Sequence, residues 1–362
     1  MPTSGTGGAE HAAARLANRF CREHEVHFLA FEQRSTDAYP LEKGVTVTEG
    51  RALVKRGCKP LAVWYYLTGF AKQRRLLRDQ IGRFDPDMVI SFLPKADTLV
   101  YSLEKQFRFR WIASERNDPT ARNRFERGFL THIYKRAGAL VCQTEKVSGY
   151  YRDRGVQKTC VIPNPLPQEH TEDAGNDEEG GYFIAAGRLD RQKNFAMLIR
   201  SFAAAVRGQG CTERLLILGE GPERKNLEQQ AAASGMEGRI SLPGNRSDIR
   251  ACMRKAKALI ISSDYEGLPN VMLEAMQEGV PVISTDYFSG AAGEYIGCES
   301  GILVPVGDEQ ALTDAIARLS RAGAEELRIM GRHGRENVRK LNEDRIAEEW
   351  YKLFERVLHD AG

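Results

Sequence analysis

Short apolar runs typical of strands alternate with helical stretches along nearly the whole chain. These runs are residues 26–30, 88–92, 111–113, 139–142, 160–163, 182–186, 215–218, 240–242, 258–261 and 280–284. Strands that are apolar throughout, instead of alternating with polar residues, indicate a sheet buried on both faces. Their alternation with helices predicts parallel sheets covered by helices on both sides, which is the α/β class.

One strand–helix–strand unit, residues 258–284, carries an unusual pair of acidic residues. Glu266 follows the first apolar run in a loop rich in Gly and Pro, and Glu274 lies eight residues later. Pro269 suits the first turn of a helix, where its missing N–H has no intrahelical partner. Glu266 is therefore predicted at the carboxyl end of a strand, where open α/β sheets bind ligands, and Glu274 about one turn into the helix. Carboxylates beside the anion-binding amides of a helix N-terminus suit a sugar nucleotide.

Length and composition predict two domains joined by a polar linker. The chain has 362 residues, which is long for one hydrophobic core. An acidic stretch with few apolar residues interrupts the strand pattern in the middle. The predicted parts are an N-terminal domain at 1–165, a linker at 166–181, a second domain at 182–342 and a final helix at 343–362.

The first domain opens on a glycine-rich loop without a strand before it. Gly7 and Gly8 lead directly into a helical pattern. In a doubly wound domain such a loop follows the first strand. We therefore expect either that the start codon is placed too late or that this domain lacks its first strand.

Charge is distributed unevenly between the two halves. Residues 1–165 hold 28 Lys and Arg against 17 Asp and Glu, whereas residues 166–362 hold 24 against 32. The excess is concentrated in the run from Arg51 to Arg83, where Trp64, Tyr65 and Phe70 are interleaved with cations. Basic and aromatic residues on one helix predict contact with an anionic membrane surface or an anionic acceptor. The alternative is a solvated helix whose aromatic residues pack into the core.

The remaining composition predicts a cytoplasmic protein that is peripheral at the inner face of the cell membrane. The seven cysteines are scattered and form no Cys-x-x-Cys pair, which favours free thiols and argues against a zinc site. The N-terminus lacks the basic flank and apolar stretch of a signal peptide. The longest apolar run, 61–71, is about half of a membrane span.

Three motifs together resemble the retaining glycosyltransferases of family 4. They are Glu266-x7-Glu274 within Glu-Gly-Leu-Pro-Asn…Glu-Ala-Met, the upstream Gly187-Arg188-Leu189, and Lys193-Asn194. The resemblance covers nearly the whole chain and is strongest at 180–310. It implies the GT-B fold, with two Rossmann-like domains facing across a cleft and a C-terminal helix that crosses back to the first domain. It also implies transfer of a sugar from a nucleotide-sugar donor, most often a UDP-sugar, to a growing surface polysaccharide or a polyprenyl-diphosphate-linked glycan.

The resemblance assigns roles to residues of the second domain. Arg188 and Lys193 match the cations that hold the donor diphosphate, Glu266 the carboxylate that contacts the transferred sugar, and Glu274 the acceptor of ribose hydroxyl bonds. Further donor contacts are expected from Gly187, Gly244, Gly267, Leu268, Pro269, Asn270, Asn164 and Gly8. Gly219 and Gly221 resemble segments that line the base and ribose, although ordinary turn chemistry explains them equally well.

Acceptor contacts are expected in the first domain, from residues that follow predicted strands. The candidates are Glu115, Arg116, Asn117 and Lys95. A capped helix start at Asn117 or Asp118 is an equally good explanation of the first three. The resemblance to family 4 implies no use of the Asp-x-Asp metal motif of the other glycosyltransferase fold. We therefore expect no metal and no other cofactor, because Arg188 and Lys193 would replace a divalent cation.

Two other classes of function remain open on the sequence alone. A non-catalytic protein that binds nucleotide sugars or glycans would keep the fold while an incomplete first domain disables the chemistry. A nucleic-acid binder could use the basic run at 51–83 through phosphate contacts. No nucleic-acid reading motif supports the second alternative, so nucleic acid is not expected as a partner.

Overall fold

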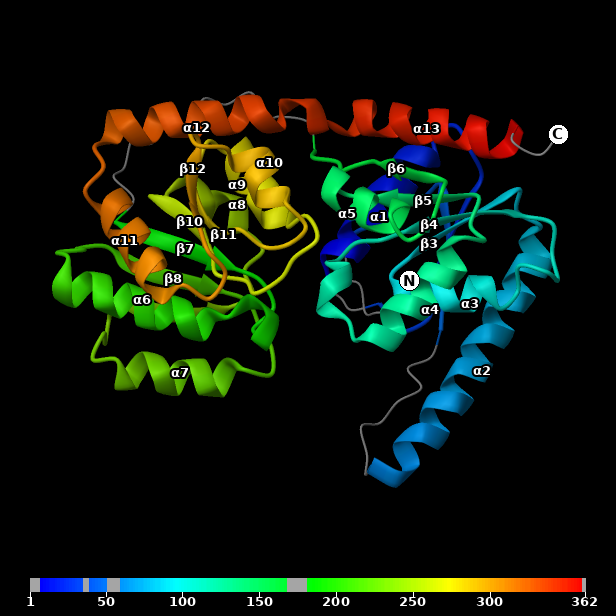
Figure 1. Ribbon diagram of the computed structural model, residues 1–362, viewed down its shortest axis with the longest axis horizontal. Coiled ribbons are helices and arrows are strands. Elements are labelled where there is room, and N and C mark those ends of the chain that lie inside the picture. The colour runs from blue at the N-terminus through cyan, green and yellow to red at the C-terminus, as the bar shows by residue number, and fades with distance from the viewer. Residues whose placement is uncertain (1–6, 35–38, 51–58, 168–180, 360–362) are drawn as a thin grey trace. The chain divides into compact units, whose positions relative to one another are not determined.

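The computed structural model describes residues 7–34, 39–50, 59–167 and 181–359, with the side chains of residues 59–68 left out. The chain divides into two compact units. Unit 1 is Met1–Pro165 together with Asn342–Gly362, and unit 2 is Leu166–Leu341. Figure 1 shows both units with their elements labelled. Of the linker predicted at 166–181, residues 168–180 lie outside the described residues.

Unit 2 is built on one parallel sheet of six strands. Its order is β12 (Gly301–Val304), β11 (Val282–Thr285), β10 (Ala258–Ile261), β7 (Tyr182–Ala186), β8 (Arg214–Leu218) and β9 (Ile240–Gly244). From β7 the chain first adds β8 and β9 on one side, and then returns to add β10, β11 and β12 on the other. The strand order therefore reverses between β7 and β10, and this is the place where doubly wound sheets bind their ligands.

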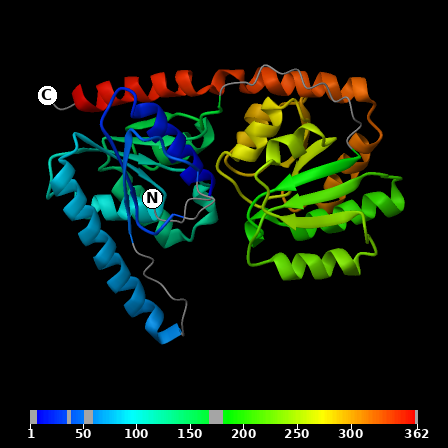
Figure 2. The same ribbon diagram turned by 180° about the vertical axis from the view of Figure 1, so that it is seen from behind.

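Helices cover both faces of this sheet, as the continuous apolar strands predict. On one face α6 (Phe195–Gly208) packs against α7 (Arg224–Ala233) and α11 (Glu309–Ser320). On the other, α8 (Ile249–Arg254), α9 (Asn270–Gln277), α10 (Ala291–Ile296) and α12 (Ala324–Val338) lie together, as Figure 2 shows from behind. All four residues of β10 are buried.

In unit 1 the described parallel strands form two separate sheets. One has the order β3 (Met88–Phe92), β4 (Arg110–Ser114), β5 (Ala139–Cys142) and β6 (Thr159–Val161), and the other pairs β1 (Val26–Ala30) with β2 (Val45–Glu49). Helix α1 (Gly8–Phe20) contacts both β1 and β3. Helix α1 is the first element of the described residues, and residues 1–6 lie outside them, so the expectation of a missing first strand stays a prediction.

Besides α1, the described part of unit 1 has five further α-helices. They are α2 (Lys59–Phe84), α3 (Pro94–Tyr101), α4 (Arg124–Tyr134), α5 (Glu145–Arg152) and α13 (Glu343–His359). Helix α3 contacts both α2 and α4, and α13 packs on α1. Trp350 of α13 is fully buried, and its ring lies 6.2 Å from that of Phe20. No helix among the described residues is both long and apolar enough to cross a membrane.

The strand predictions agree with the structure, with small shifts at the ends. Two strands were not among those expected, the short edge strands β2 and β12. Pro269 is the residue before α9 instead of the first helical residue, because its ψ of 120° is extended and the helix begins at Asn270. Glu274 lies in the second turn of α9, as predicted.

Candidate active site

Two loops come together at the reversal of strand order in unit 2. The loop after β7 contains Gly187, Arg188 and the short helix η2 (Arg191–Lys193), and the loop after β10 runs from 262 to 269. The Ser262 hydroxyl donates to the carbonyl of Lys193 at 2.8 Å, and the Asp264 amide donates to the carbonyl of Gln192 at 2.9 Å. These hydrogen bonds fix the two loops relative to each other, and they thereby fix the positions of the side chains on the loops.

Lys193 and Glu266, predicted from separate motifs, form an ion pair. Lys193 Nζ lies 2.5 Å from Glu266 Oε1. The same oxygen accepts a hydrogen bond from the Ser263 hydroxyl at 2.7 Å, and Oε2 accepts one from Gln192 Nε2 at 3.2 Å. Glu266 is buried, and the Lys193 side chain is 20% exposed. The carboxylate is therefore fixed in orientation, while its cation still reaches the surface.

Ser263 and Gln192 were missed by the sequence analysis. Both had a weak signal in the sequence, since Gln192 precedes Lys193 and Ser263 lies three residues before Glu266. Tyr265 completes the surroundings of the loop. Burial raises its pKa, and the charges of Asp190 and Glu266 raise it further, so its hydroxyl stays neutral.

Arg188 and the predicted donor residues at the start of α9 lie at the same edge of the sheet without joining the ion pair. Arg188 is 71% exposed in its side chain and pairs with Asp190 at 2.6 Å. Gly267 and Leu268 are buried, and the carbonyl of Gly267 accepts a bond from the Ser289 hydroxyl at 2.6 Å. Asn270 opens α9, and Glu274 is half-buried on it. The beginning of α9 is thus fixed directly beside Glu266.

Close contacts between loops explain the glycines at the carboxyl ends of β7, β8 and β9. The Gly219 amide donates to the carbonyl of Gly244 at 3.0 Å. Gly219 has φ +139°, and a Cβ there would overlap the carbonyl oxygen of Gly187. Both features exclude other residues. Packing alone accounts for Gly219, and donor contact by Gly187 and Gly244 stays a prediction.

In unit 1 the structure revises the expectation for Glu115. Its carboxylate is 1% exposed and bound inside the unit: Arg122 bonds both oxygens at 2.6 and 2.7 Å, and the Tyr151 hydroxyl donates at 2.8 Å. The backbone amides of Arg116 and Asn117 donate to Oε1 as well. Burial raises the pKa of Glu115, but Arg122 and the hydrogen bonds outweigh burial and hold the pKa below its ordinary value. We therefore interpret Glu115 as an anchor of the loop after β4.

The capping alternative also holds for this loop. Asp118 accepts a bond from the Thr120 amide at 2.7 Å, and Asn117 accepts one from the Asp118 amide at 2.9 Å. These bonds close the turn that opens the helix η1 (Pro119–Ala121). Asn117 thus has a structural role that is sufficient to explain its presence.

Arg116 keeps part of its donor capacity unused. It is 8% exposed, stacks on Phe92 at 5.0 Å, and donates from Nη1 to Asn164 Oδ1 at 2.7 Å. Its Nε and Nη2 have no hydrogen-bond partner among the described residues, and burial lowers its pKa to about 10. Asn164 is itself bound by Arg116 and Gln143.

The two remaining candidates of unit 1 are Lys95 and Gly8. Lys95, near the start of α3, lies 3.7 Å from Glu32. Gly8 is the first residue of α1. Ligand contacts by all these residues stay predictions.

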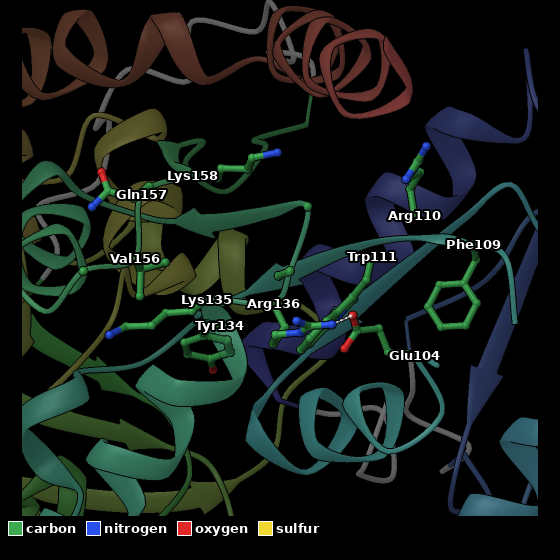
Figure 3. A pocket seen from close by; sticks show the side chains of 13 residues that line it. Glu104, Phe109, Arg110, Trp111, Tyr134, Lys135, Arg136, Val156, Gln157 and Lys158 are labelled. Atoms are coloured by element: carbon green, nitrogen blue, oxygen red, sulfur yellow. Dashed lines mark hydrogen bonds and ion pairs between the residues drawn. The ribbon is translucent and has the colours of Figure 1, made fainter. Parts of the chain in front are cut away.

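The hollow shown in Figure 3 lies at the amino ends of the strands of the unit 1 sheet, opposite to the strand ends that carry the loops described above. Its volume is about 370 Å³, and its lining includes the residues at the amino ends of β4 and β6, with Arg110, Lys135, Arg136 and Lys158 as cations. Glu104 pairs with Arg136 there at 3.0 Å. Because parallel sheets bind substrates at the carboxyl ends of their strands, we do not assign the donor to this hollow.

No metal-binding group of three or more His, Cys, Asp or Glu side chains occurs in the described part of the chain. Two family models match this chain. The family model described as Glycosyltransferase Family 4 matches residues 6–170, and the model described as Glycosyl transferases group 1 matches residues 180–322.

Two curated relatives match along nearly their full length. One is the Campylobacter jejuni enzyme named GalNAc-alpha-(1->4)-GalNAc-alpha-(1->3)-diNAcBac-PP-undecaprenol alpha-1,4-N-acetyl-D-galactosaminyltransferase, with 26% identity over 99% of this chain and 97% of the relative. Another is the lipopolysaccharide core biosynthesis glycosyltransferase LpsD of Rhizobium meliloti, with 26% identity over 97% of this chain and 95% of the relative.

Solved structures share the fold. Sucrose-phosphate synthase of Thermosynechococcus elongatus superposes with a TM-score of 0.81 at 20% identity, covering 98% of this chain and 94% of the other. HepE of Anabaena in complex with UDP and glucose superposes with a TM-score of 0.76 at 16% identity, covering 98% of both chains. Since the two family models together span most of the sequence, this chain belongs to glycosyltransferase family 4 and has the two Rossmann-like units of the GT-B fold.

Proposed function

We propose that the chain transfers a sugar from a UDP-sugar to a hydroxyl of a lipid-linked or surface glycan, with retention of configuration and without a metal. The observation that carries the proposal is the Lys193–Glu266 pair at the reversal of strand order. A cation and a fixed carboxylate in adjacent loops match the two charges that develop when a glycosidic bond to a diphosphate breaks.

Cations and backbone amides would stabilise the negative charge of the leaving group. As the bond between the anomeric carbon and the phosphate oxygen breaks, both bonding electrons move to the nucleoside diphosphate. Lys193, Arg188 and the amides at the start of α9 would bind that charge, in the manner of preorganised donors at a developing anion. The Lys193 ammonium would turn from Glu266 toward the diphosphate and bind it.

The transferred sugar develops positive charge at its anomeric carbon, and a carboxylate can stabilise this charge without acting as a nucleophile. Ser263, Gln192 and Lys193 engage both oxygens of Glu266, so its charge supports the positive anomeric carbon without bonding to it. The acceptor hydroxyl would attack from the face that the diphosphate leaves, and its proton would pass to the leaving phosphate oxygen. Glu274 would bind the ribose hydroxyls.

The acceptor is proposed from the relatives and from charge. The Campylobacter relative is named for an undecaprenol-diphosphate glycan. In this chain α2 presents exposed Lys72, Arg75 and Arg83, in the described part of the basic run. These cations suit an anionic membrane surface on which a lipid-linked acceptor would be presented. The protein would accordingly act at the inner face of the cell membrane.

The test measures donor binding and transfer separately. In a thermal-shift panel of UDP, UDP-sugars and GDP-sugars, we expect the uridine nucleotides to raise the melting temperature. We expect sugar transfer to continue in the presence of EDTA. Glu266→Gln keeps the shape of the side chain and removes its charge; we expect it to bind UDP normally and to lose roughly a hundredfold or more in turnover. Glu325→Gln, on the surface of α12, is the matched control.

Three results would contradict the proposal. Normal turnover by Glu266→Gln would remove the role of the carboxylate. An inverted product, determined by NMR of the new linkage, would remove the front-face mechanism. UDP binding without transfer to any glycan acceptor would favour a non-catalytic binding protein.

A further inference from the structure

The outer face of α4 carries two exposed phenylalanines. The inner face of the helix is buried through Leu130, Ile133 and Tyr134. On the opposite side Phe125 is 90% exposed and Phe129 is 47% exposed. They are the only aromatic residues among the exposed large hydrophobic side chains of the described residues. Single exposed apolar residues are ordinary, but two large rings on one helix call for a partner.

The spacing places these rings in a single stripe. Phe125, Phe129 and His132 follow each other at i, i+4 and i+7, so their side chains lie on the same side of the helix. Arg124 and Gly128 form the neighbouring row. Because Gly128 adds no side chain beside the rings, the stripe is accessible from outside.

Cations flank the stripe at both ends of the helix. Arg124 opens α4, and Lys135 and Arg136 follow its last residue. Arg124 and Lys135 are exposed and form no ion pair with a described residue, whereas Arg136 pairs with Glu104. The only acidic residue of the helix is Glu126. Lys135 and Arg136 also line the basic hollow of Figure 3, which extends the positive surface beyond the helix.

We propose that the outer face of α4 inserts into the headgroup region of an anionic bilayer. Phe125 and Phe129 would enter the boundary between headgroups and acyl chains, while Arg124, Lys135 and Arg136 would bind lipid phosphates. This inference rests on the proposed function in one respect, since a lipid-linked acceptor requires the enzyme to work at a membrane. Helix α4 contacts α3, which contacts α2, so both basic helices belong to the same unit.

The size of the patch favours a membrane over a second copy of the chain. Two phenylalanines bury about 150–250 Å² each, so two copies meeting here would cover roughly 600–1,000 Å². A stable dimer interface needs about 1,600 Å². The surrounding positive charge would further disfavour the meeting of two identical faces.

The first experiment measures partition of the full-length protein onto vesicles. We expect binding to phosphatidylcholine vesicles that contain about one-third phosphatidylglycerol, weak binding to phosphatidylcholine alone, and loss of binding at high salt. Phe125→Ser with Phe129→Ser should weaken partition at least about tenfold. The matched control is Ile329→Ser with Leu358→Ser, which removes apolar residues that are 41% and 45% exposed on α12 and α13.

Charge is tested in the same assay. Arg124→Gln with Lys135→Gln should reduce partition about fivefold for each charge. Arg332→Gln with Arg345→Gln, two exposed arginines on α12 and α13, removes the same charge elsewhere. An equal loss in the control pair would show that only net charge matters, and it would overturn the assignment to α4.

The second experiment locates the contact directly. In Phe125→Trp the added indole should shift its emission to the blue on vesicles and be quenched by brominated phospholipids, and Ile329→Trp should show neither. Unchanged emission of Phe125→Trp on bound vesicles, unchanged partition of the double Ser variant, or a dimer in light scattering that the double Ser variant abolishes would each overturn the proposal.

Failure of the inference can be told apart from failure of the proposed function. Binding of UDP, measured by thermal shift without vesicles, reports on the proposed donor site and does not require membrane contact by α4. If the double Ser variant leaves vesicle binding intact while UDP still binds, only the role of α4 is wrong. If UDP does not bind while α4 still inserts, the proposed donor is wrong and the membrane contact stands.

Discussion

The two units each place an ion pair after a strand of their parallel sheet, and the two pairs differ in what they leave free. In unit 1, Arg122 bonds Glu115 through two nitrogens, and the side chains are 13% and 0% exposed. In unit 2, Lys193 bonds Glu266 through one atom, and the side chains are 20% and 9% exposed. The first pair is saturated by Tyr151 and two backbone amides, whereas the second has a flexible cation that reaches the surface.

This difference separates a structural ion pair from one that can take part in chemistry. A planar guanidinium in a bidentate bond is fixed, and in unit 1 the Tyr151 hydroxyl and two backbone amides take the remaining lone pairs of the carboxylate. A lysine is a mobile point charge that can turn to a phosphate while Ser263 and Gln192 keep Glu266 in place. Both carboxylates follow strands in the sequence, but only the one in unit 2 is arranged to share its cation.

Breaking the pair in unit 1 should have the largest effect, and the effect should be on stability. Glu115→Gln leaves Arg122 buried without its charge partner, so we expect a loss of about 3–5 kcal/mol in the free energy of unfolding. The measurement is urea unfolding at neutral pH. A variant as stable as the parent would show that the pair does not anchor the loop.

The pH dependence follows from the direction of the shift. The pKa of Glu115 in the folded protein lies below its ordinary value of 4.5, so its stabilisation is present above pH 4.5 and is lost as pH falls through the lowered pKa. The difference in stability between Glu115→Gln and the parent should therefore shrink below about pH 4.5. A difference that is constant with pH would mean that packing, not charge, causes the loss.

Removing the cation in unit 2 should instead affect turnover. Lys193→Ala should lower kcat roughly a hundred- to a thousandfold with little change in melting temperature, because a donor to the leaving diphosphate is lost. Lys193→Arg should not restore the rate, since a planar fork replaces a mobile ammonium. Arg188→Ala, which removes an exposed cation paired with Asp190, should cost about tenfold. Equal losses for Lys193→Ala and Arg188→Ala would contradict the distinction between them.

The smallest effect is expected from a residue that positions Glu266. Ser263→Ala removes one of three side-chain bonds to the carboxylate, which is worth about 1 kcal/mol and about a fivefold loss in kcat. The KM for the donor should not change, because the Ser263 hydroxyl donates its hydrogen bond to Glu266. The control is Ser241→Ala, on the exposed side of β9. An increase in KM with kcat unchanged would assign Ser263 to donor binding.

The core strands could be read from the sequence because burial on both faces makes them continuously apolar. The two strands not expected, β2 and β12, are at the edges of their sheets. Strand β2 alternates Val and Thr, and its Val47 is 40% exposed. Strand β12 begins at Gly301, where a Cβ would overlap the carbonyl oxygen of Val282. Edge strands are buried on fewer sides, so their sequences carry a weaker pattern.

For the site, the position after a strand of the parallel sheet was sufficient to single out Glu266, and Lys193 was named through the resemblance to family 4. The same local signal named Glu115 as an acceptor contact, and the structure showed instead a carboxylate satisfied by Arg122 and Tyr151. Chain distance hid the second partner, since Tyr151 lies 36 residues beyond Glu115.

Sequence alone thus determined the α/β class and the central strands, and it named the loops that we propose to carry the chemistry, because periodicity and strand ends are properties of short segments. Only the tertiary structure decided which carboxylate keeps a cation that can be shared and which is locked. That outcome depends on burial and on hydrogen bonds between residues far apart in the chain. The exposed face of α4 was also decided by the tertiary structure, since exposure is known only after the rest of the unit has packed against the helix.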